Sequence, residues 1–239
     1  MGRPETTIDR LLGGRLRVEQ PRHGYRTGAD SVLLAAAGTG GKVLDVGAGV
    51  GTVGLCLAKR LADARVTLLE RDAEAAALAR DNAAANDLAG RVEVVAGDLR
   101  ERPVPMHHFD SVVTNPPYFA AHSSPGATDA ARRAARTEAE VPLADWLRFC
   151  VAALRPGGTL TLVHRMERLP AILAALEGGV TVFPLWPRAG KPSKTVLVRK
   201  VKDSNARLTM RPGLVLHEAD GRNTVAADAV LRGGASLDL

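Results

Sequence analysis

The tetrapeptide Asn115-Pro116-Pro117-Tyr118 contains residue types that could hold a planar substrate carrying an amino group. It follows an apolar run, 109–114, that predicts a buried strand. The two prolines lack a backbone N–H, so the strand must end there. The Asn115 carboxamide oxygen and the Pro116 carbonyl are both acceptors for an amine, and the tyrosine ring could stack on a flat substrate. The alternative is a Pro-Pro-Tyr segment that only ends a strand.

A second group of residues predicts a strand, a glycine-rich loop and a helix in succession. The strand is 42–47, the loop contains Gly47-Ala48-Gly49-Val50-Gly51, and the helix runs to residue 61. Glycines permit a tight turn and let a ligand approach the backbone closely. Gly49, Gly51 and Gly54 also satisfy the dinucleotide pattern GxGxxG, which by itself is a weak indication.

Acidic residues accompany the ends of three predicted strands. Asp45 lies near the end of the first, Glu70 closes a strand at 65–69, and Asp98 follows a strand at 92–95. In open α/β sheets, ligands bind beyond the carboxyl ends of the strands. We therefore expect three carboxylates at one edge of the sheet, where one of them could accept hydrogen bonds from the two hydroxyls of a ribose.

These residues require a doubly wound sheet to bring them together. Beyond the four strands above, the pattern predicts strands at 159–163, 181–185 and 195–201, a hairpin around 11–18, and helices at 31–37, 72–85, 142–154, 167–176 and 225–231. Because no helix separates the last two strands of the sheet, we expect them to form an antiparallel hairpin at its edge. The first helix is expected to begin at an Asp30 or Ser31 N-cap. The prediction is a seven-stranded, Rossmann-like α/β fold.

The composition is that of an ordinary globular protein. The 239 residues are 46% hydrophobic and 24% charged, enough for one α/β domain with a full core. No apolar run approaches the ~18–20 residues of a membrane span, and the N-terminus lacks the apolar region of a secretory signal. Cys56 and Cys150 have neither metal-ligand nor disulfide spacing. We expect no bound metal, buried thiols and a reducing, cytoplasmic location.

The net charge of +6 and a pI of about 9.8 permit a polyanionic partner. Four of the six lysines fall in one short stretch with Arg188 and Arg199, namely Lys191, Lys194, Lys200 and Lys202. We interpret this stretch as a surface that faces phosphates, with a strand edge protected by lysines as the alternative. Arg132 and Arg133, in the sparsely apolar stretch 119–140, are further candidates, with a solvated helix face as the alternative.

The chain resembles the class I S-adenosylmethionine-dependent methyltransferases in the order of its motifs. These are Asp45 to Gly51, Glu70, Asp98, the Asn-Pro-Pro-Tyr motif and an antiparallel last strand. The motif is similar to that of the branch that methylates amino groups, on adenine N6 or glutamine N5. Nearly the whole chain resembles the bacterial tRNA1(Val) adenine-N6 methyltransferase family, including residues 14–16, 20–21, 28–30 and 217–221. The resemblance implies one methyltransferase domain over 1–239, with a substrate-side segment 1–41, a core 42–201 and an extension 202–239.

The resemblance also implies a role for each matching residue. S-adenosyl-L-methionine would contact Gly47, Ala48, Gly49 and Gly51, with Asp45 behind this loop and able to reach the cofactor's ammonium group through backbone or water. Glu70 would hold the ribose hydroxyls, and Asp98 the adenine amine, with Leu99 packed on that ring. The implied catalytic residues are Asn115 (also beside the cofactor), Pro116, Pro117 and Tyr118. The implied substrate is the N6 amine of adenosine 37 in a tRNA. From the charge pattern, we expect Arg132, Arg133, Lys191 and Lys194 to face its phosphates.

Other interpretations remain open at this point. An NAD-dependent dehydrogenase could use the glycine loop, but the chain has no evident second substrate domain. A glutamine-N5 protein methyltransferase shares the motif, yet the ~40 residues before the first strand leave little room for its usual helical substrate domain. An adenine methyltransferase of ribosomal RNA and an RNA-binding protein without activity are further alternatives.

Overall fold

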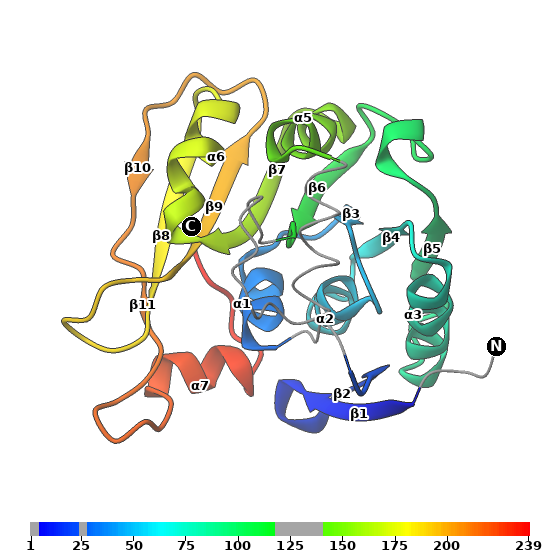
Figure 1. Cartoon of the computed structure of the whole chain (residues 1–239), viewed down its shortest axis with the longest axis horizontal. Helices are drawn as coiled ribbons and strands as arrows, with labels where there is room; N and C mark the ends of the chain where they lie inside the picture. The colour runs from blue at the N-terminus through cyan, green and yellow to red at the C-terminus, as the bar shows by residue number, and fades with distance from the viewer. Residues whose placement is uncertain (1–4, 24–27, 118–140) are drawn as a thin grey trace, which may run out of the picture.

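The computed structural model describes residues 5–23, 28–117 and 141–239. These residues form a nine-stranded sheet covered by helices on both faces, and a separate two-stranded hairpin (Figure 1). The hairpin consists of β1 (Thr6–Leu11) and β2 (Leu16–Pro21). The sheet strands are β3 (Lys42–Val46), β4 (Arg65–Glu70), β5 (Val92–Ala96), β6 (Phe109–Thr114), β7 (Leu154–Arg165), β8 (Val180–Trp186), β9 (Thr195–Val201), β10 (Thr209–Met210) and β11 (Leu214–Val215).

The strand order is β10-β8-β9-β7-β6-β3-β4-β5, and β11 also pairs with β8. Strands β3 to β7 are mutually parallel, whereas β9 is antiparallel to both of its neighbours, β7 and β8. The predicted α/β fold and the antiparallel β8–β9 hairpin are thus confirmed. The sheet has nine strands rather than the predicted seven, because the two-residue strands β10 and β11 pair with β8 and place the hairpin inside the edge. After β3 the chain crosses to β4 on one side of β3 and later reaches β6 on the other side. The strand order therefore reverses at β3. Open α/β sheets bind ligands beyond the carboxyl ends of the strands at such a reversal.

The helices cover the two faces unequally. One face carries α1 (Ala29–Ala37), α2 (Thr52–Arg60), α3 (Ala73–Ala85) and α7 (Val225–Leu231), and the other carries α5 (Leu143–Ala153) and α6 (Leu169–Ala175). Each face has its own apolar core, which includes Leu33, Leu55 and Leu57 on the first and Leu147, Leu160 and Leu162 on the second. Parallel strands covered on both sides read as continuous apolar runs, which is why their positions were predictable from the sequence.

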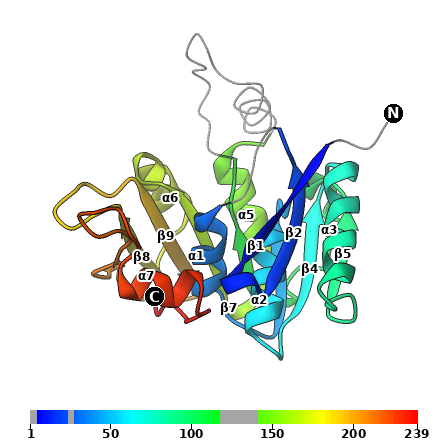
Figure 2. The same ribbon diagram turned by 90° about the horizontal axis from the view of Figure 1, so that it is seen from below.

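The β1–β2 hairpin docks on α3 through two asparagines. Figure 2 shows the hairpin on the side of the sheet that carries α1, α2 and α3. Asn82 accepts from Glu19 N at 2.7 Å and donates through Nδ2 to Val50 O at 3.0 Å. Asn86 accepts from Arg17 N at 2.9 Å. Because Val50 belongs to the glycine-rich loop, Asn82 joins the hairpin and that loop to one helix.

Several predicted boundaries differ from the structure. Strand β7 begins at Leu154 rather than at 159, and the hairpin extends from Thr6 to Pro21 rather than over 11–18. The first helix begins at Ala29 with Gly28 as its N-cap and no side-chain capping bond, so the expected cap at Asp30 or Ser31 is wrong. The chain already has helical geometry at both residues, and Asp30 lies within the first turn. The helix predicted at 167–176 is a short 3₁₀ turn, Met166–Arg168, followed by α6, which starts beside Pro170 because proline suits the first helical turn.

Candidate active site

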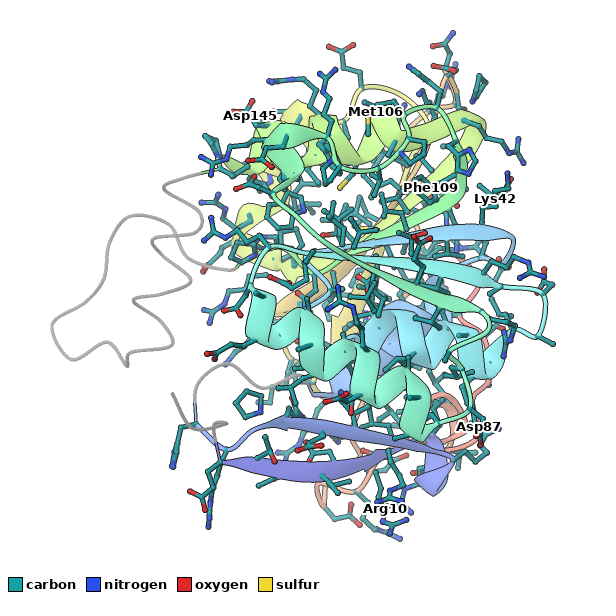
Figure 3. All side chains as sticks on the ribbon, turned by 90° about the vertical axis from the view of Figure 1, so that its right-hand side faces the viewer. Arg10, Lys42, Asp87, Met106, Phe109 and Asp145 are labelled. Carbon is teal, nitrogen blue, oxygen red and sulfur yellow. The ribbon has the colours of Figure 1, made fainter. Side chains whose placement is uncertain are left out.

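The central pair of strands, β3 and β6, brings the glycine loop and the proline motif together. The two strands pair in parallel with Val46 opposite Thr114. The residues that follow, Gly47 and Asn115, therefore leave the same edge of the sheet side by side. Figure 3 shows Lys42 and Phe109, where β3 and β6 begin, toward the opposite side from Asp145 in the first turn of α5.

The glycine loop has a backbone shape that side chains would strain. Gly47, Gly49 and Gly51 have φ of 70°, 56° and 87°. A Cβ on Gly47 would lie 2.7 Å from Trp146 Cζ2, and one on Gly51 would lie 2.9 Å from Leu68 Cδ1. A Cβ on Gly49 would meet nothing within 4 Å. Core side chains therefore pack against the loop at Gly47 and Gly51, whereas the loop is open at Gly49. A ligand has room to approach the backbone there.

Asp45 lies beneath this loop and does not reach the surface. Its side chain is buried, and Oδ2 accepts from Gly54 N, in the first turn of α2, at 2.9 Å. The pKa of Asp45 is raised to about 7, chiefly by burial and to a smaller extent by the nearby Glu70 charge, against the lowering effect of the Gly54 bond. The residue thus anchors α2 behind the loop, and any effect on a ligand must pass through the backbone.

We expect Asp45→Asn to stabilise the protein relative to the wild type as the pH rises from about 4 to about 7. The folded protein retains the Asp45 proton up to a pKa of about 7, whereas an unfolded chain releases it near ~4. The contribution of Asp45 to the free energy of unfolding therefore falls through this window, by at most about 1.4 kcal/mol per pH unit, and is constant above it. Urea unfolding of both proteins at several pH values measures the difference. The exposed Asp63→Asn is the control and should show no such trend.

Two carboxylates flank the loop at the ends of β4 and β5. Glu70 Oε2 accepts from Gly49 N and Oε1 from Asp72 N, both at 2.8 Å. Asp98 accepts from Arg100 N at 2.9 Å and forms an ion pair with Arg100 Nη2 at 2.6 Å. The Arg100 contacts hold the pKa of Asp98 below its usual range. Leu99 is half-buried and packs against the second core.

The proline motif leaves the sheet beside the loop. Asn115 and Pro117 are half-buried and Pro116 is buried, and the Asn115 Oδ1 atom is shielded from solvent. Tyr118, Arg132 and Arg133 lie outside the described residues, as do Tyr25 to Thr27. The structure thus brings together Gly47, Gly49, Glu70 and Asn115 at one edge and leaves the stacking role of Tyr118 as a prediction.

Two further ionisable residues accompany this edge. Asp30 lies in the first turn of α1. Because a short turn connects the end of α1 to the start of β3, the last turn of α1 lies near the amino end of β3, and its first turn lies toward the carboxyl edge of the sheet. Burial raises the pKa of Asp30.

His164 is buried near the end of β7, and its Nδ1 accepts from Arg165 N at 2.8 Å. Burial and the charges of Arg168 and Arg165 lower the pKa of His164 to about 4, so the ring is neutral at neutral pH. From the sequence, a capping role is predicted for Asp30 and no role is predicted for His164.

The lysine-rich stretch separates into two parts. Lys191 and Lys194 are exposed in the turn between β8 and β9, and Met166 N donates to Lys194 O at 2.9 Å. Strands β7 and β8 are both antiparallel to β9, so they run in the same direction and this turn lies at the same sheet edge as the site.

Lys200 and Lys202 do not belong to that surface, contrary to the prediction. Both are buried: Lys200 Nζ donates to Gly178 O at 2.5 Å, and Lys202 Nζ donates to Leu154 O at 2.6 Å. Arg199 donates to Leu239 O at 3.0 Å. These cations bind backbone carbonyls because β9 lies inside the sheet, between β7 and β8, rather than at a solvated edge.

The remaining sequence expectations concern cysteines, metals and membranes. Cys56 and Cys150 are free and buried, as predicted, and burial raises the pKa of both thiols. Within residues 5–23, 28–117 and 141–239, no group of His, Cys, Asp and Glu side chains could hold a metal ion. No helix in the part of the chain that the structure describes is long and apolar enough to cross a membrane.

Comparison with known proteins gives a consistent picture. The family described as "Methyltransferase small domain" matches residues 29–182. The tRNA1(Val) (adenine(37)-N6)-methyltransferase of Aeromonas hydrophila is 33% identical over 215 residues, covering 87% of this chain and 89% of the relative. The enzyme of the same name from Porphyromonas gingivalis is 37% identical over 166 residues, covering 65% and 64%.

A solved structure extends the similarity to the fold. A protein from Agrobacterium tumefaciens described as a predicted O-methyltransferase has a TM-score of 0.72 and 31% identity, covering 87% of this chain and 98% of that one. The glycine loop, the end of β4 and the proline motif all fall within the matched residues 29–182. This chain belongs to the small-domain methyltransferases and, within them, to the tRNA1(Val) (adenine(37)-N6)-methyltransferase family.

Proposed function

We propose that this protein transfers the methyl group of S-adenosyl-L-methionine to the exocyclic N6 amine of adenosine 37 in a tRNA. The observation that carries the proposal is the parallel pairing of β3 with β6. It places the glycine loop directly beside Asn115 and Pro116. The names of the relatives support the RNA substrate.

The residues at this edge fit the cofactor. The open side of Gly49 accommodates the methionine part, and the Glu70 carboxylate, at the end of β4, accepts from the ribose hydroxyls. Asp98 accepts from the adenine amine and Leu99 packs on that ring, with Gly47, Ala48 and Gly51 supplying backbone around the methionine part. When bound, the cofactor supplies an electrophilic methyl group on a sulfonium sulfur.

The target amine requires activation because its lone pair is delocalised into the adenine ring. The Asn115 Oδ1 atom and the Pro116 carbonyl each accept one N–H, which draws the amine out of the ring plane and localises the lone pair. Pro117 stiffens the exit of the chain from β6. Positioning supplies most of the acceleration, and the proton, acidic after transfer, leaves to water. The base must be turned out of its stack, and Tyr118 offsets this with about 1–3 kcal/mol of stacking.

Lys191 and Lys194, which are exposed at the carboxyl edge, are proposed to bind RNA phosphates. Arg132 and Arg133, outside the described residues, are proposed from the sequence to do the same. We expect Lys191→Ala with Lys194→Ala to weaken RNA binding and to reduce the slope of log affinity against log salt by about 0.7–0.9 per lost phosphate contact. Lys59→Ala with Arg65→Ala removes the same charge at the opposite edge of the sheet, where both side chains are exposed. Filter binding over a salt series measures both slopes, and equal slopes for the two variants would contradict the assignment.

Methyl transfer from labelled S-adenosylmethionine to total tRNA that lacks the modification, followed by nucleoside analysis, tests the proposed function. We expect labelled N6-methyladenosine with the wild type, and labelling slower by about 100- to 1,000-fold with Asn115→Ala. Ribonuclease mapping of the labelled tRNA should place the label at adenosine 37. Binding of the cofactor without transfer to tRNA would overturn the tRNA substrate and favour ribosomal RNA or a protein glutamine. A rise in melting temperature with NAD but not with S-adenosylhomocysteine would overturn the reaction class.

A further inference from the structure

A chain of hydrogen bonds joins helix α5 to the neighbouring strands β6 and β3 immediately beneath the site. Trp146 Nε1 donates to Thr114 Oγ1 at 2.9 Å, and Thr114 Oγ1 donates to Val46 O at 2.8 Å. Thr114 and Val46 are register partners at the ends of β6 and β3. Thr114 is 0% exposed and Trp146 is 7% exposed, so water does not compete for these bonds.

The same indole also supports the glycine loop. A Cβ on Gly47 would lie 2.7 Å from Trp146 Cζ2 and 2.9 Å from Cη2, so the ring edge lies directly against Gly47. Gly47 follows Val46, and Asn115 follows Thr114. The Trp146 side chain from α5 therefore lies against Gly47, which opens the glycine loop, and donates a hydrogen bond to Thr114, which precedes Asn115.

We propose that Trp146 and Thr114 are positioning residues for methyl transfer. They set the separation between the loop that contacts the methyl donor and the Asn115 and Pro116 acceptors that hold the methyl acceptor. The inference rests on the proposed function and adds two residues that would act through Gly47 and Asn115 rather than by contact with a ligand. A displacement of about 1 Å between donor and acceptor can lower a rate by about 100-fold without preventing either ligand from binding. The hydrogen-bond chain is thus expected to control kcat rather than affinity.

Substitutions can separate the hydrogen bonds from the packing. Thr114→Val keeps the side-chain shape but can neither accept nor donate, so it removes the hydrogen bonds alone. Trp146→Phe removes both the N–H and the ring edge, Cζ2 and Cη2, that lies against Gly47. Thr114→Ser keeps the hydroxyl. We expect the first two variants to lower kcat by about 10- to 100-fold, with KM for tRNA and Kd for S-adenosylhomocysteine within about threefold of wild type. Thr114→Ser should retain kcat within about threefold.

Two controls distinguish positioning from loss of stability. Trp186→Phe also removes an indole N–H, which donates to Pro212 O at 2.9 Å at the end of β8, and should leave kcat unchanged. Leu147→Ala opens the core next to Trp146, where Leu147 is 0% exposed. It should lower the melting temperature without the selective loss of kcat. Because Trp146 and Thr114 act in one chain, the double variant should lose no more kcat than either single variant.

An unchanged kcat in Trp146→Phe and Thr114→Val overturns the inference, as does a loss that Thr114→Ser shares in full. A wild-type protein that transfers no methyl group to any RNA overturns the proposed function instead. In that case the NMR signal of the Trp146 indole N–H tests the inference alone. S-adenosylhomocysteine should shift this signal in the wild type and leave the Trp186 signal in place. An unmoved Trp146 signal overturns the inference.

Discussion

Asn115→Ala is expected to lower kcat for methyl transfer by about 100- to 1,000-fold while the protein still binds S-adenosylhomocysteine. The estimate follows from the loss of one preorganised polar group at a reacting centre. Asn115 leaves the end of β6 next to the glycine loop, and its Oδ1 atom is shielded from solvent. An acceptor held in this way needs little reorganisation when an amine arrives, so its removal affects the transition state more than cofactor binding.

Single-turnover methylation of tRNA and calorimetric titration with S-adenosylhomocysteine measure the two quantities separately. Asn205→Ala is the matched control because Asn205 is exposed and lies away from the site, after β9. Retention of the wild-type rate by Asn115→Ala would show that the Pro116 carbonyl suffices for the amine. A matching loss of cofactor affinity would assign Asn115 to the cofactor rather than to the target.

Glu70→Ala is expected to weaken S-adenosylmethionine binding by about 100-fold. A carboxylate that accepts from ribose hydroxyls forms charged hydrogen bonds, each worth about 1.5–3 kcal/mol, and a tenfold change in Kd corresponds to about 1.4 kcal/mol. The variant also loses the acceptor for Gly49 N, since Glu70 Oε2 lies 2.8 Å from that nitrogen. Both losses act on the cofactor side of the site.

Glu74→Ala removes the same charge from the first turn of α3, where the side chain is exposed, and should leave the affinity within about threefold of wild type. Glu70→Gln keeps the length of the side chain and an acceptor, so an intermediate Kd is expected. Calorimetry on all three variants is the measurement. A Kd for Glu70→Ala close to that of wild type would exclude the ribose assignment while leaving the fold unaffected.

Several elements were predictable to within one or two residues from the sequence because their signals are local. Phe109–Thr114 and Thr195–Val201 coincide with the predicted strands, and the last helix is Val225–Leu231 as expected. Buried parallel strands require continuous apolar residues, and prolines and glycines end them. The residue types of the site, from the glycine loop to the proline motif, were equally visible for the same reason.

The sequence by itself thus determined the α/β fold, the glycine loop and the proline motif. The tertiary structure decided which polar groups reach the ligand edge. Asp45 looks like Glu70 and Asp98 in the sequence, yet only Asp45 is fully buried beneath the loop. Lys200 resembles Lys194, but the place of β9 between two strands buries it against carbonyls. Trp146 has no local signal, because its bond to Thr114 joins residues 32 positions apart. Burial and pairing depend on which strands and helices become neighbours, and that information lies in no single segment.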